Sequence, residues 1–324
     1  MNYELKIKNL KSYFSNGKLL LTGEYLVLDG ALSLAIPTKY GQSLETESII
    51  DSKLIWKSFD EKGKVWFEDT FEIINNEISL SVRNDNPISK RLLQILNETK
   101  KLNPDFLKAQ NGFKISTKLD FPQNWGLGTS STLINNIAQW ANIDPYQLLE
   151  NTFGGSGYDV ACAQYNKPIT YQLFDNQNEI SHAVLNDKKR SNKEVNFNPT
   201  FKNHLYFVYL NQKKNSRDGI AQYKKNTSDL SESISEINTI TQNMISCESL
   251  DTFISLINKH ENIISNIIKQ KPVKETLFSD FNGSLKSLGA WGGDFVLVAS
   301  KEKPSSYFKS KGFDTIIPYQ DMIL

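Results

Sequence analysis

Residues 124–140, NWGLGTSSTLINNIAQW, place glycines and small hydroxyl residues directly before an apolar helical pattern. Glycine lets the backbone approach an oxygen-rich ligand closely, and the first N–H groups of a helix attract phosphate. The same hydroxyl residues also often cap helices, so a phosphate-binding loop and an ordinary capped loop are both open. The candidate phosphate-binding residues are Gly126, Leu127, Gly128, Thr129, Ser130 and Ser131.

This loop fits neither of two common nucleotide-binding patterns. No Gly-Lys-Ser or Gly-Lys-Thr follows it, as a P-loop would require. Ser131 stands where a dinucleotide fingerprint would have its third glycine.

A second glycine-rich segment, FGGSGYDVACAQY at residues 153–165, carries an acidic residue, Asp159. Phosphoryl transfer needs an oriented acceptor hydroxyl, a group near it that can take its proton, and cations for the phosphoryl oxygens. A carboxylate on a glycine-rich turn could serve as that group, although Asp159 could instead cap a helix. A third segment, LGAWGGDFVLVAS at residues 288–300, predicts a tight loop or bulge before a buried strand.

Composition excludes several function classes. The 324 residues are 39% hydrophobic and 23% charged with a formal net charge of +1, which predicts no strong field toward nucleic acid or membrane. The two cysteines form no CxxC pair, and no apolar run is long enough for a signal peptide or a membrane span. We expect a cytoplasmic protein with a small-molecule substrate and no nucleic-acid or membrane partner; a homodimer is an open alternative.

The chemistry-bearing segments lie among mixed strands and helices, which favours an α+β fold. We expect strands at residues 18–22, 24–28, 31–36, 52–59, 64–73, 112–121, 168–174, 204–210, 294–300 and 312–319. Asp29 and Gly30 predict a hairpin turn, and the pair Asp144-Pro145 predicts a helix start. We expect helices at residues 86–102, after Gly128, and over residues 217–246 and 249–268. The Lys- and Asn-rich residues 186–203 predict a surface loop or domain junction.

In this order and spacing, the three glycine-rich segments resemble motifs of the GHMP kinase superfamily, which includes galactokinase, homoserine kinase, mevalonate kinase and phosphomevalonate kinase. SNGKLLLTGEYLVLDGALSLAIP, residues 15–37, resembles its first motif, and GLGTSS resembles its phosphate-binding motif. GSGYDVACA resembles the segment with its catalytic aspartate, and GAWGGDFVLV resembles its third motif. LYFVYLNQKKNSRDGIAQY, residues 205–223, looks like the opening of its C-terminal domain. The resemblance spans nearly the whole chain.

The resemblance implies roles for individual residues. Lys18 matches a lysine near the transferred phosphoryl group, and Asp159 matches the aspartate that orients or deprotonates the acceptor hydroxyl. Ser130 is implied to hold Mg²⁺, with Glu150 as a candidate second ligand. On the substrate side we expect Glu24, Ser156, Gly157, Gly292 and Gly293. The chain departs from the family pattern at Ser131, Trp291 and Asp294, where small residues are usual.

The implied fold is an N-terminal domain at residues 1–190, like the second domain of ribosomal protein S5, followed by a ferredoxin-like domain at residues 191–324. The implied cofactors are ATP and Mg²⁺, and the implied activity is a kinase for phosphomevalonate or mevalonate. The first motif has Tyr25 after Gly-Glu, which resembles bacterial phosphomevalonate kinases more than mevalonate kinases, where histidine is usual. A diphosphomevalonate decarboxylase, a non-catalytic nucleotide- or metabolite-binding relative and a nicotinamide oxidoreductase are the alternatives.

Overall fold

The computed structural model describes residues 9–74, 77–108, 112–174, 189–212, 216–225, 229–289, 291 and 293–324. The chain separates into two compact units, each made of segments far apart in sequence. Unit 1 contains the segment ending at Gly17, Tyr40–Gln123 and Gly128–Gln164. Unit 2 contains Lys18–Lys39, Asn124–Leu127 and Tyr165–Leu324. Each unit combines segments from several parts of the sequence, whereas the expected domains are continuous ranges, 1–190 and 191–324; that division stays a prediction.

Unit 1 is built on a mixed sheet. Its strands, with the later part of β2 (Ser33–Ile49), are β3 (Lys53–Phe59), β4 (Val65–Ile74), β5 (Glu77–Leu80) and β6 (Gly112–Leu119), in the order β5-β4-β3-β6-β2. The β3 and β6 strands are parallel, with Leu54 opposite Phe113, and the other neighbours are antiparallel. Strand β1 (Leu10–Leu20) also pairs with β2.

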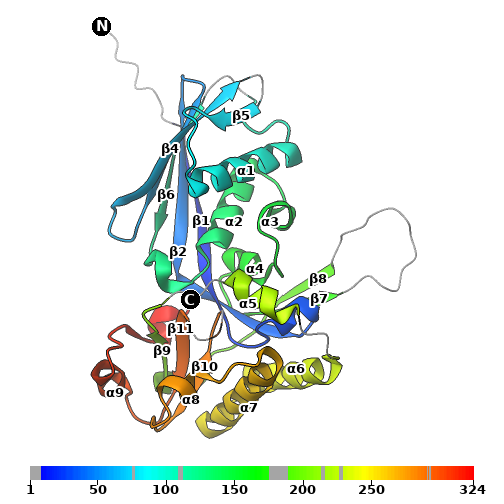
Figure 1. Ribbon diagram of the computed structural model, residues 1–324, viewed down its shortest axis with the longest axis vertical. Coiled ribbons are helices and arrows are strands. Elements are labelled where there is room, and N and C mark those ends of the chain that lie inside the picture. Colours follow the sequence, from blue (N-terminus) through cyan, green and yellow to red (C-terminus); the bar gives the residue numbers. More distant parts are fainter. Residues whose placement is uncertain are drawn as a thin grey trace, which may run out of the picture. The chain divides into compact units, whose positions relative to one another are not determined.

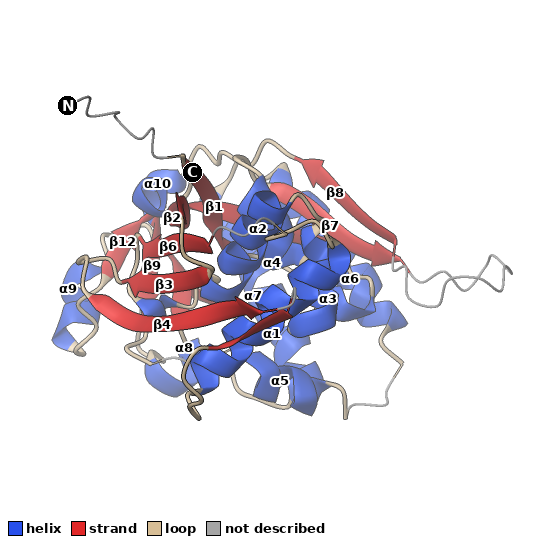
Figure 2. Cartoon of the chain, turned by 90° about the horizontal axis from the view of Figure 1, so that it is seen from above, coloured by secondary structure: helices blue, strands red, loops and turns tan. Residues whose placement is uncertain are grey.

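Helices cover one face of this sheet, as Figures 1 and 2 both show. They are α1 (Pro87–Leu102), α2 (Thr129–Ala141) and α3 (Pro145–Thr152), and α4 (Tyr158–Gln164) packs on α2. Trp56 and Phe71 from the sheet and Leu96, Ile134 and Ile137 from the helices form a shared buried core. The apolar stripes of these helices therefore set their position on the sheet.

Local capping explains where two of these helices begin. The Asn86 side chain accepts the N–H of Ile88 at 2.9 Å, and the Asp144 side chain accepts the N–H of Tyr146 at 2.8 Å. A proline, whose missing N–H costs nothing at the first helical position, follows each cap. The helix start predicted from Asp144-Pro145 is confirmed, and the helix expected over residues 86–102 is present as α1.

Unit 2 contains an antiparallel four-stranded sheet in the order β10-β11-β9-β12. Its strands are β9 (Leu205–Tyr209), β10 (Ser284–Ser287), β11 (Phe295–Ala299) and β12 (Ile316–Pro318). Helices α5 (Ser216–Tyr223), α6 (Ser231–Ile245), α7 (Leu250–Ile268) and α8 (Val273–Leu277) connect the first two strands, and α9 (Ser305–Ser310) connects the last two. This β-α-β-β-α-β order is the ferredoxin-like arrangement, so the predicted α+β class is confirmed.

The rest of unit 2 includes a strand ladder and a short C-terminal helix. The start of β2 pairs with β7 (Ile169–Phe174), which pairs with β8 (Lys189–Glu194). Helix α10 (Tyr319–Met322) follows β12. Within the described ranges, no helix combines the length and the apolar character needed to cross a membrane.

Three local predictions were wrong. The expected strand at residues 24–28 is largely a 3₁₀ helix, Leu26–Asp29, and Gly30 at φ 88° ends this helix instead of forming a hairpin. A short buried apolar run fits either structure, so the pattern did not decide between them. Residues 186–203 include β8, since a polar edge strand can pair through its backbone. The helix expected over residues 217–246 is two helices, α5 and α6.

Candidate active site

Helix α2 begins at the glycine-rich loop without a side-chain cap. Its N-cap is Gly128, which has φ 97° and no side chain to accept a hydrogen bond. The first intrahelical bond runs from Thr132 N–H to Gly128 O at 3.0 Å. The earlier amides of the first turn, at residues 129–131, have no acceptor within the helix. The start of α2 is therefore suited to an anion, and the interpretation of the run as a hydroxyl-capped loop is not supported.

The hydroxyl groups of this first turn differ in their surroundings. Ser131 is buried and its Oγ donates to Gly128 O at 2.9 Å. The Thr132 hydroxyl donates to Gln42 Oε1 at 2.7 Å. Ser130 is exposed. Ser130 is therefore the exposed one of these three residues, while the hydroxyls of Ser131 and Thr132 bond to neighbouring protein groups.

Within unit 2, the structure brings Lys18 to the first half of the loop. Lys18 lies on β1 and is half-buried. Its backbone N–H donates to Leu127 O at 2.9 Å, and its Nζ donates to Gly126 O at 3.1 Å. The sequence separation of Lys18 and Gly126 is 108 residues, so this meeting results from the fold.

The third glycine-rich segment also reaches this loop. Gly126 has φ 68°, and a Cβ built on it would lie 2.2 Å from Oδ2 of Asp294. Glycine is thus required at position 126 both by its backbone and by the carboxylate beside it. Trp291 and Asp294 have φ values of 53° and 54°, which L-residues rarely adopt. Gly293 is buried in this segment, and the predicted Gly292 lies outside the described residues.

Asp159 lies in the first turn of α4, after a turn in which Gly154, Gly155 and Gly157 all have positive φ. Its Oδ1 accepts the N–H of Val160 at 3.1 Å. It is half-buried, and the helix N-terminus favours its negative charge. Of the neighbouring predicted residues, Ser156 is half-buried and Gly157 is buried.

Glu150 is exposed near the end of α3. Among the residues that the structure describes, no group of three His, Cys, Asp or Glu side chains could hold a metal ion. Mg²⁺ typically uses only one or two protein carboxylates plus phosphate and water oxygens, so it needs no such group, and Ser130 and Glu150 stay its predicted ligands. Ser130, Glu150 and Asp159 belong to unit 1 and Lys18 to unit 2, so their assembly around one substrate stays a prediction.

Glu24 of the first motif is almost fully buried within unit 2. Its Oε1 accepts a hydrogen bond from Lys286 Nζ, and its Oε2 lies 3.3 Å from His260 Nε2. Burial raises the pKa of Glu24 to about 7, against the opposing effect of Lys286. These contacts give Glu24 partners inside the unit and do not favour the predicted substrate-side role.

Lys286 continues this buried cluster. Its Nζ lies 3.3 Å from Glu261 Oε1, and Ser287 Oγ donates to Glu261 Oε2 at 2.7 Å. Burial, followed by the charge of Lys286, lowers the pKa of His260 well below its usual value, so this ring is neutral. Sequence reasoning missed this cluster. Its signal was the pair His260-Glu261, polar residues at positions that α7 buries.

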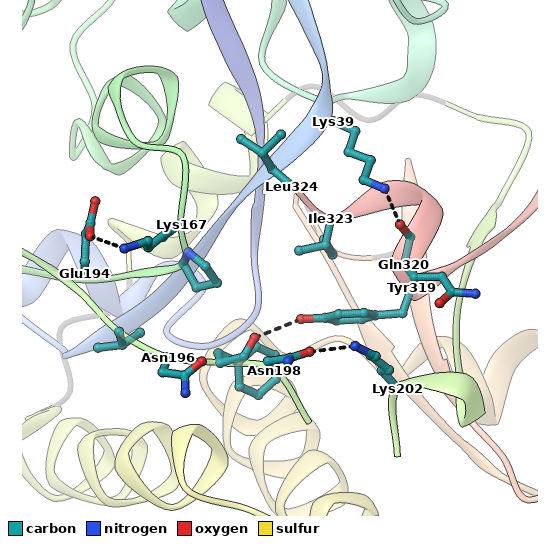
Figure 3. A pocket seen from close by; sticks show the side chains of 13 residues that line it. Lys39, Lys167, Glu194, Asn196, Asn198, Lys202, Tyr319, Gln320, Ile323 and Leu324 are labelled. Carbon is teal, nitrogen blue, oxygen red and sulfur yellow. Dashed lines mark hydrogen bonds and ion pairs between the residues drawn. The ribbon is translucent and has the colours of Figure 1, made fainter. Parts of the chain in front are cut away.

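A pocket of about 630 Å³ in unit 2 contains none of the predicted residues (Figure 3). Three lysines along it have protein partners. Lys39 donates to Gln320 O at 2.7 Å, Lys202 donates to Asn198 Oδ1 at 2.9 Å, and Lys167 lies 3.4 Å from Glu194. The pocket is therefore separate from the glycine-rich loop, and its cations are engaged with the protein.

Comparison by sequence finds no relative. No protein-family model matches the chain, and no curated protein matches it.

Comparison by structure finds several kinases over nearly the full length. The chain is similar to the mevalonate kinase of Methanococcus jannaschii, with 17% identity, a TM-score of 0.66 and coverage of 97% of this chain and 98% of that one. For Streptococcus pneumoniae phosphomevalonate kinase in complex with phosphomevalonate and AMPPNP, the identity is 17%, the TM-score 0.64 and the coverages 93% and 95%. For Lactococcus lactis galactokinase complexed with galactose, the identity is 14% and the TM-score 0.65, with coverage of 94% of this chain and 88% of that one. The chain therefore shares the fold of these kinases, which are of the types whose motifs its sequence resembles.

Proposed function

We propose that the chain is an ATP-dependent phosphotransferase of the GHMP type, with phosphomevalonate or mevalonate as acceptor. The observation that carries the proposal is the start of α2, where an uncapped helix end follows a loop held by Lys18. Helix ends of this kind favour phosphate through their free amides and their dipole.

ATP would bind along the loop from Gly126 to Ser131. The amides of the first turn of α2 would hold the triphosphate, because Gly128 offers no side chain that competes for them. Mg²⁺ would be held by the hydroxyl of the exposed residue Ser130 and by the carboxylate of Glu150. When bound, this ion supplies positive charge to the phosphoryl oxygens.

Asp159 and Lys18 would act at the acceptor. Asp159 would orient the acceptor oxygen and take its proton as the new O–P bond forms and the bond to ADP breaks. Lys18 would stabilise charge on the transferred phosphoryl group. Its Nζ lies at the loop, where it donates to Gly126 O at 3.1 Å.

Two observations support an isoprenoid-pathway acceptor. Mevalonate kinase and phosphomevalonate kinase are among the solved structures that share the fold over at least 93% of the chain. Tyr25 follows Gly-Glu in the first motif, as in bacterial phosphomevalonate kinases. Tyr25 has φ 63°, and its ring stacks on Tyr223 with centroids 5.5 Å apart.

The test is ADP release with Mg²⁺ and ATP against phosphomevalonate, mevalonate, homoserine and galactose. We expect turnover with one of the first two. Turnover with homoserine or galactose alone would overturn the acceptor and keep the kinase. CO₂ release from diphosphomevalonate would instead indicate a decarboxylase. Nucleotide binding without any product would indicate a non-catalytic relative and contradict the proposal.

A further inference from the structure

Asp294 places a carboxylate against a loop that, in the proposed function, binds a polyanion. We propose that Asp294 makes nucleotide binding depend on the divalent cation, because its charge disfavours ATP that carries no cation. This inference rests on the proposed function and assigns to that site a residue that selects the charge state of the nucleotide.

The position of Asp294 is fixed by its backbone. Its N–H donates to Gln212 O and its carbonyl accepts the N–H of Leu210, both at 2.8 Å. The residue is 9% exposed. A non-glycine residue at φ 54° is held there by such surroundings at a cost in backbone energy. The carboxylate is therefore a placed charge, unlike that of a mobile surface side chain.

This charge lies directly at the loop. A Cβ built on Gly126 would be 2.2 Å from Asp294 Oδ2, and one built on Gly289 would be 3.2 Å from the same atom. Gly126 is two residues before Gly128, the N-cap of α2. Two residues of chain span at most about 7 Å, so the residue beside the carboxylate belongs to the segment that leads directly into α2.

The loop segment beside Asp294 is held on several sides within unit 2. Tyr209 OH donates to Asn124 O at 3.1 Å, and Trp125 packs edge-on against Phe295 with centroids 5.3 Å apart. After burial, the charge of Asp294 is the next cause that raises the pKa of Tyr209. The carboxylate thus acts electrostatically on a neighbour of this segment.

The position of Lys18 gives a second reason why loss of the Asp294 carboxylate should strengthen phosphate binding. Its Nζ donates to the carbonyl of Gly126, the residue on which Asp294 packs. Gly126 thus lies beside both an ammonium group and a carboxylate. Removing the carboxylate makes the electrostatic potential at this residue more positive, which favours phosphate in the same direction as removing the repulsion.

The effect depends on the charge of the nucleotide. Metal-free ATP carries about four negative charges near neutral pH and its magnesium complex about two, so a fixed carboxylate repels the first more. With water-like screening at roughly 10 Å, one carboxylate weakens binding of the magnesium complex by up to about threefold and binding of metal-free ATP by about tenfold.

The test is titration calorimetry of ATP in excess EDTA and in excess Mg²⁺ with the full chain. We expect Asp294→Asn to strengthen metal-free binding about tenfold and binding of the magnesium complex by less than about threefold. Asp251→Asn is the matched control, since it removes one negative charge at an exposed pair with Lys301. Asp294→Gly, a residue that tolerates φ 54°, is the second variant if the asparagine protein unfolds.

The outcomes separate the two proposals. If wild-type protein binds the magnesium complex and neither Asp294 variant changes the ratio of the two affinities, this inference fails and the proposed function stands. Weaker metal-free binding in Asp294→Asn would overturn it as well. If wild-type protein binds no ATP under either condition, the proposed function fails and the inference fails with it.

Discussion

The carboxyl Oε2 of Glu24 and the ring Nε2 of His260 lie 3.3 Å apart in the interior of unit 2. The same nitrogen accepts the N–H of Gly23 at 3.0 Å, so it carries no hydrogen of its own. Two acceptor atoms can face each other favourably only if one carries a proton. Burial raises the pKa of both Glu24 and Glu261, and we infer that Glu24, whose pKa rises to about 7, is protonated in the folded protein below that pH.

The first prediction concerns the stability of this cluster as a function of pH. Burial raises the pKa of Glu24 from 4.5 to about 7, so the folded state binds its proton more tightly than the unfolded state. The resulting stabilisation is complete below pH 4.5 and is lost as pH rises through 7. Glu24→Gln keeps the shape of the side chain but cannot titrate. Between pH 4.5 and 8 its free energy of unfolding should therefore rise relative to that of wild type by up to about 3 kcal/mol. Urea unfolding across this range measures the difference.

The matched control is Glu236→Gln, which removes an exposed carboxylate 2.8 Å from Lys259. Its unfolding free energy should stay within about 0.5 kcal/mol of wild type at each pH, because exposed pairs contribute little. Parallel pH profiles of wild type and Glu24→Gln would show that Glu24 is ionised in the folded protein and would contradict the assignment.

The second prediction concerns Gly126 and Asp294. Alanine at position 126 meets both a positive φ and the Asp294 carboxylate, so Gly126→Ala should lower the free energy of unfolding by about 2–4 kcal/mol. Gly63→Ala is the control, since Gly63 has φ 78° and open space around it. Backbone strain alone should lower the free energy of unfolding of this variant by about 1–2 kcal/mol.

The double variant Gly126→Ala, Asp294→Gly separates contact from backbone strain. Removing the carboxylate removes the clash, so the double variant should be at least about 1 kcal/mol more stable than the sum of the single effects predicts. Guanidinium unfolding of the four proteins gives this coupling energy. Strictly additive effects would mean that the two residues do not contact each other in solution.

Local signals explain most of what the sequence predicted about the fold. The starts of α1 and α3 depend on the pairs Asn86-Pro87 and Asp144-Pro145, whose hydrogen bonds are made within two residues. Strand β8 was missed because its pairing with β7 is made by backbone groups, about which its lysines and asparagines say nothing. The turn at residues 26–29 was missed because a buried apolar run does not distinguish a strand from a 3₁₀ helix.

Only the local part of the candidate site could be predicted from the sequence. Glycines placed directly before an apolar helical pattern single out the loop at residues 126–131. The contact of Glu24 with Lys286 joins residues 262 positions apart, and no sequence period encodes such a pair. Asp294 beside Gly126 is of the same kind, since its role follows from packing that only the folded chain creates.

The third prediction concerns Lys18. Lys18→Met keeps the apolar stem of the side chain and removes the ammonium group that donates to Gly126 O. In steady-state assays with the acceptor that turns over, kcat should fall about 10²- to 10³-fold, as expected when one preorganised charge is lost. Lys11→Met, an exposed lysine on the same strand, should leave kcat unchanged. A kcat within threefold of wild type would remove Lys18 from the catalytic residues.

The fourth prediction tests Asp159 as the group that takes the acceptor proton. Asn at this position keeps an oxygen for the N–H of Val160, so Asp159→Asn should fold as wild type does. It should lower kcat by about 10²- to 10⁴-fold while the Kd of ATP with Mg²⁺ changes less than about threefold. Asp105→Asn, which removes an exposed carboxylate 2.9 Å from Lys108, is the control and should leave both constants unchanged. Weaker ATP binding with unchanged kcat would instead place Asp159 on the nucleotide side, and another group would then have to take the proton.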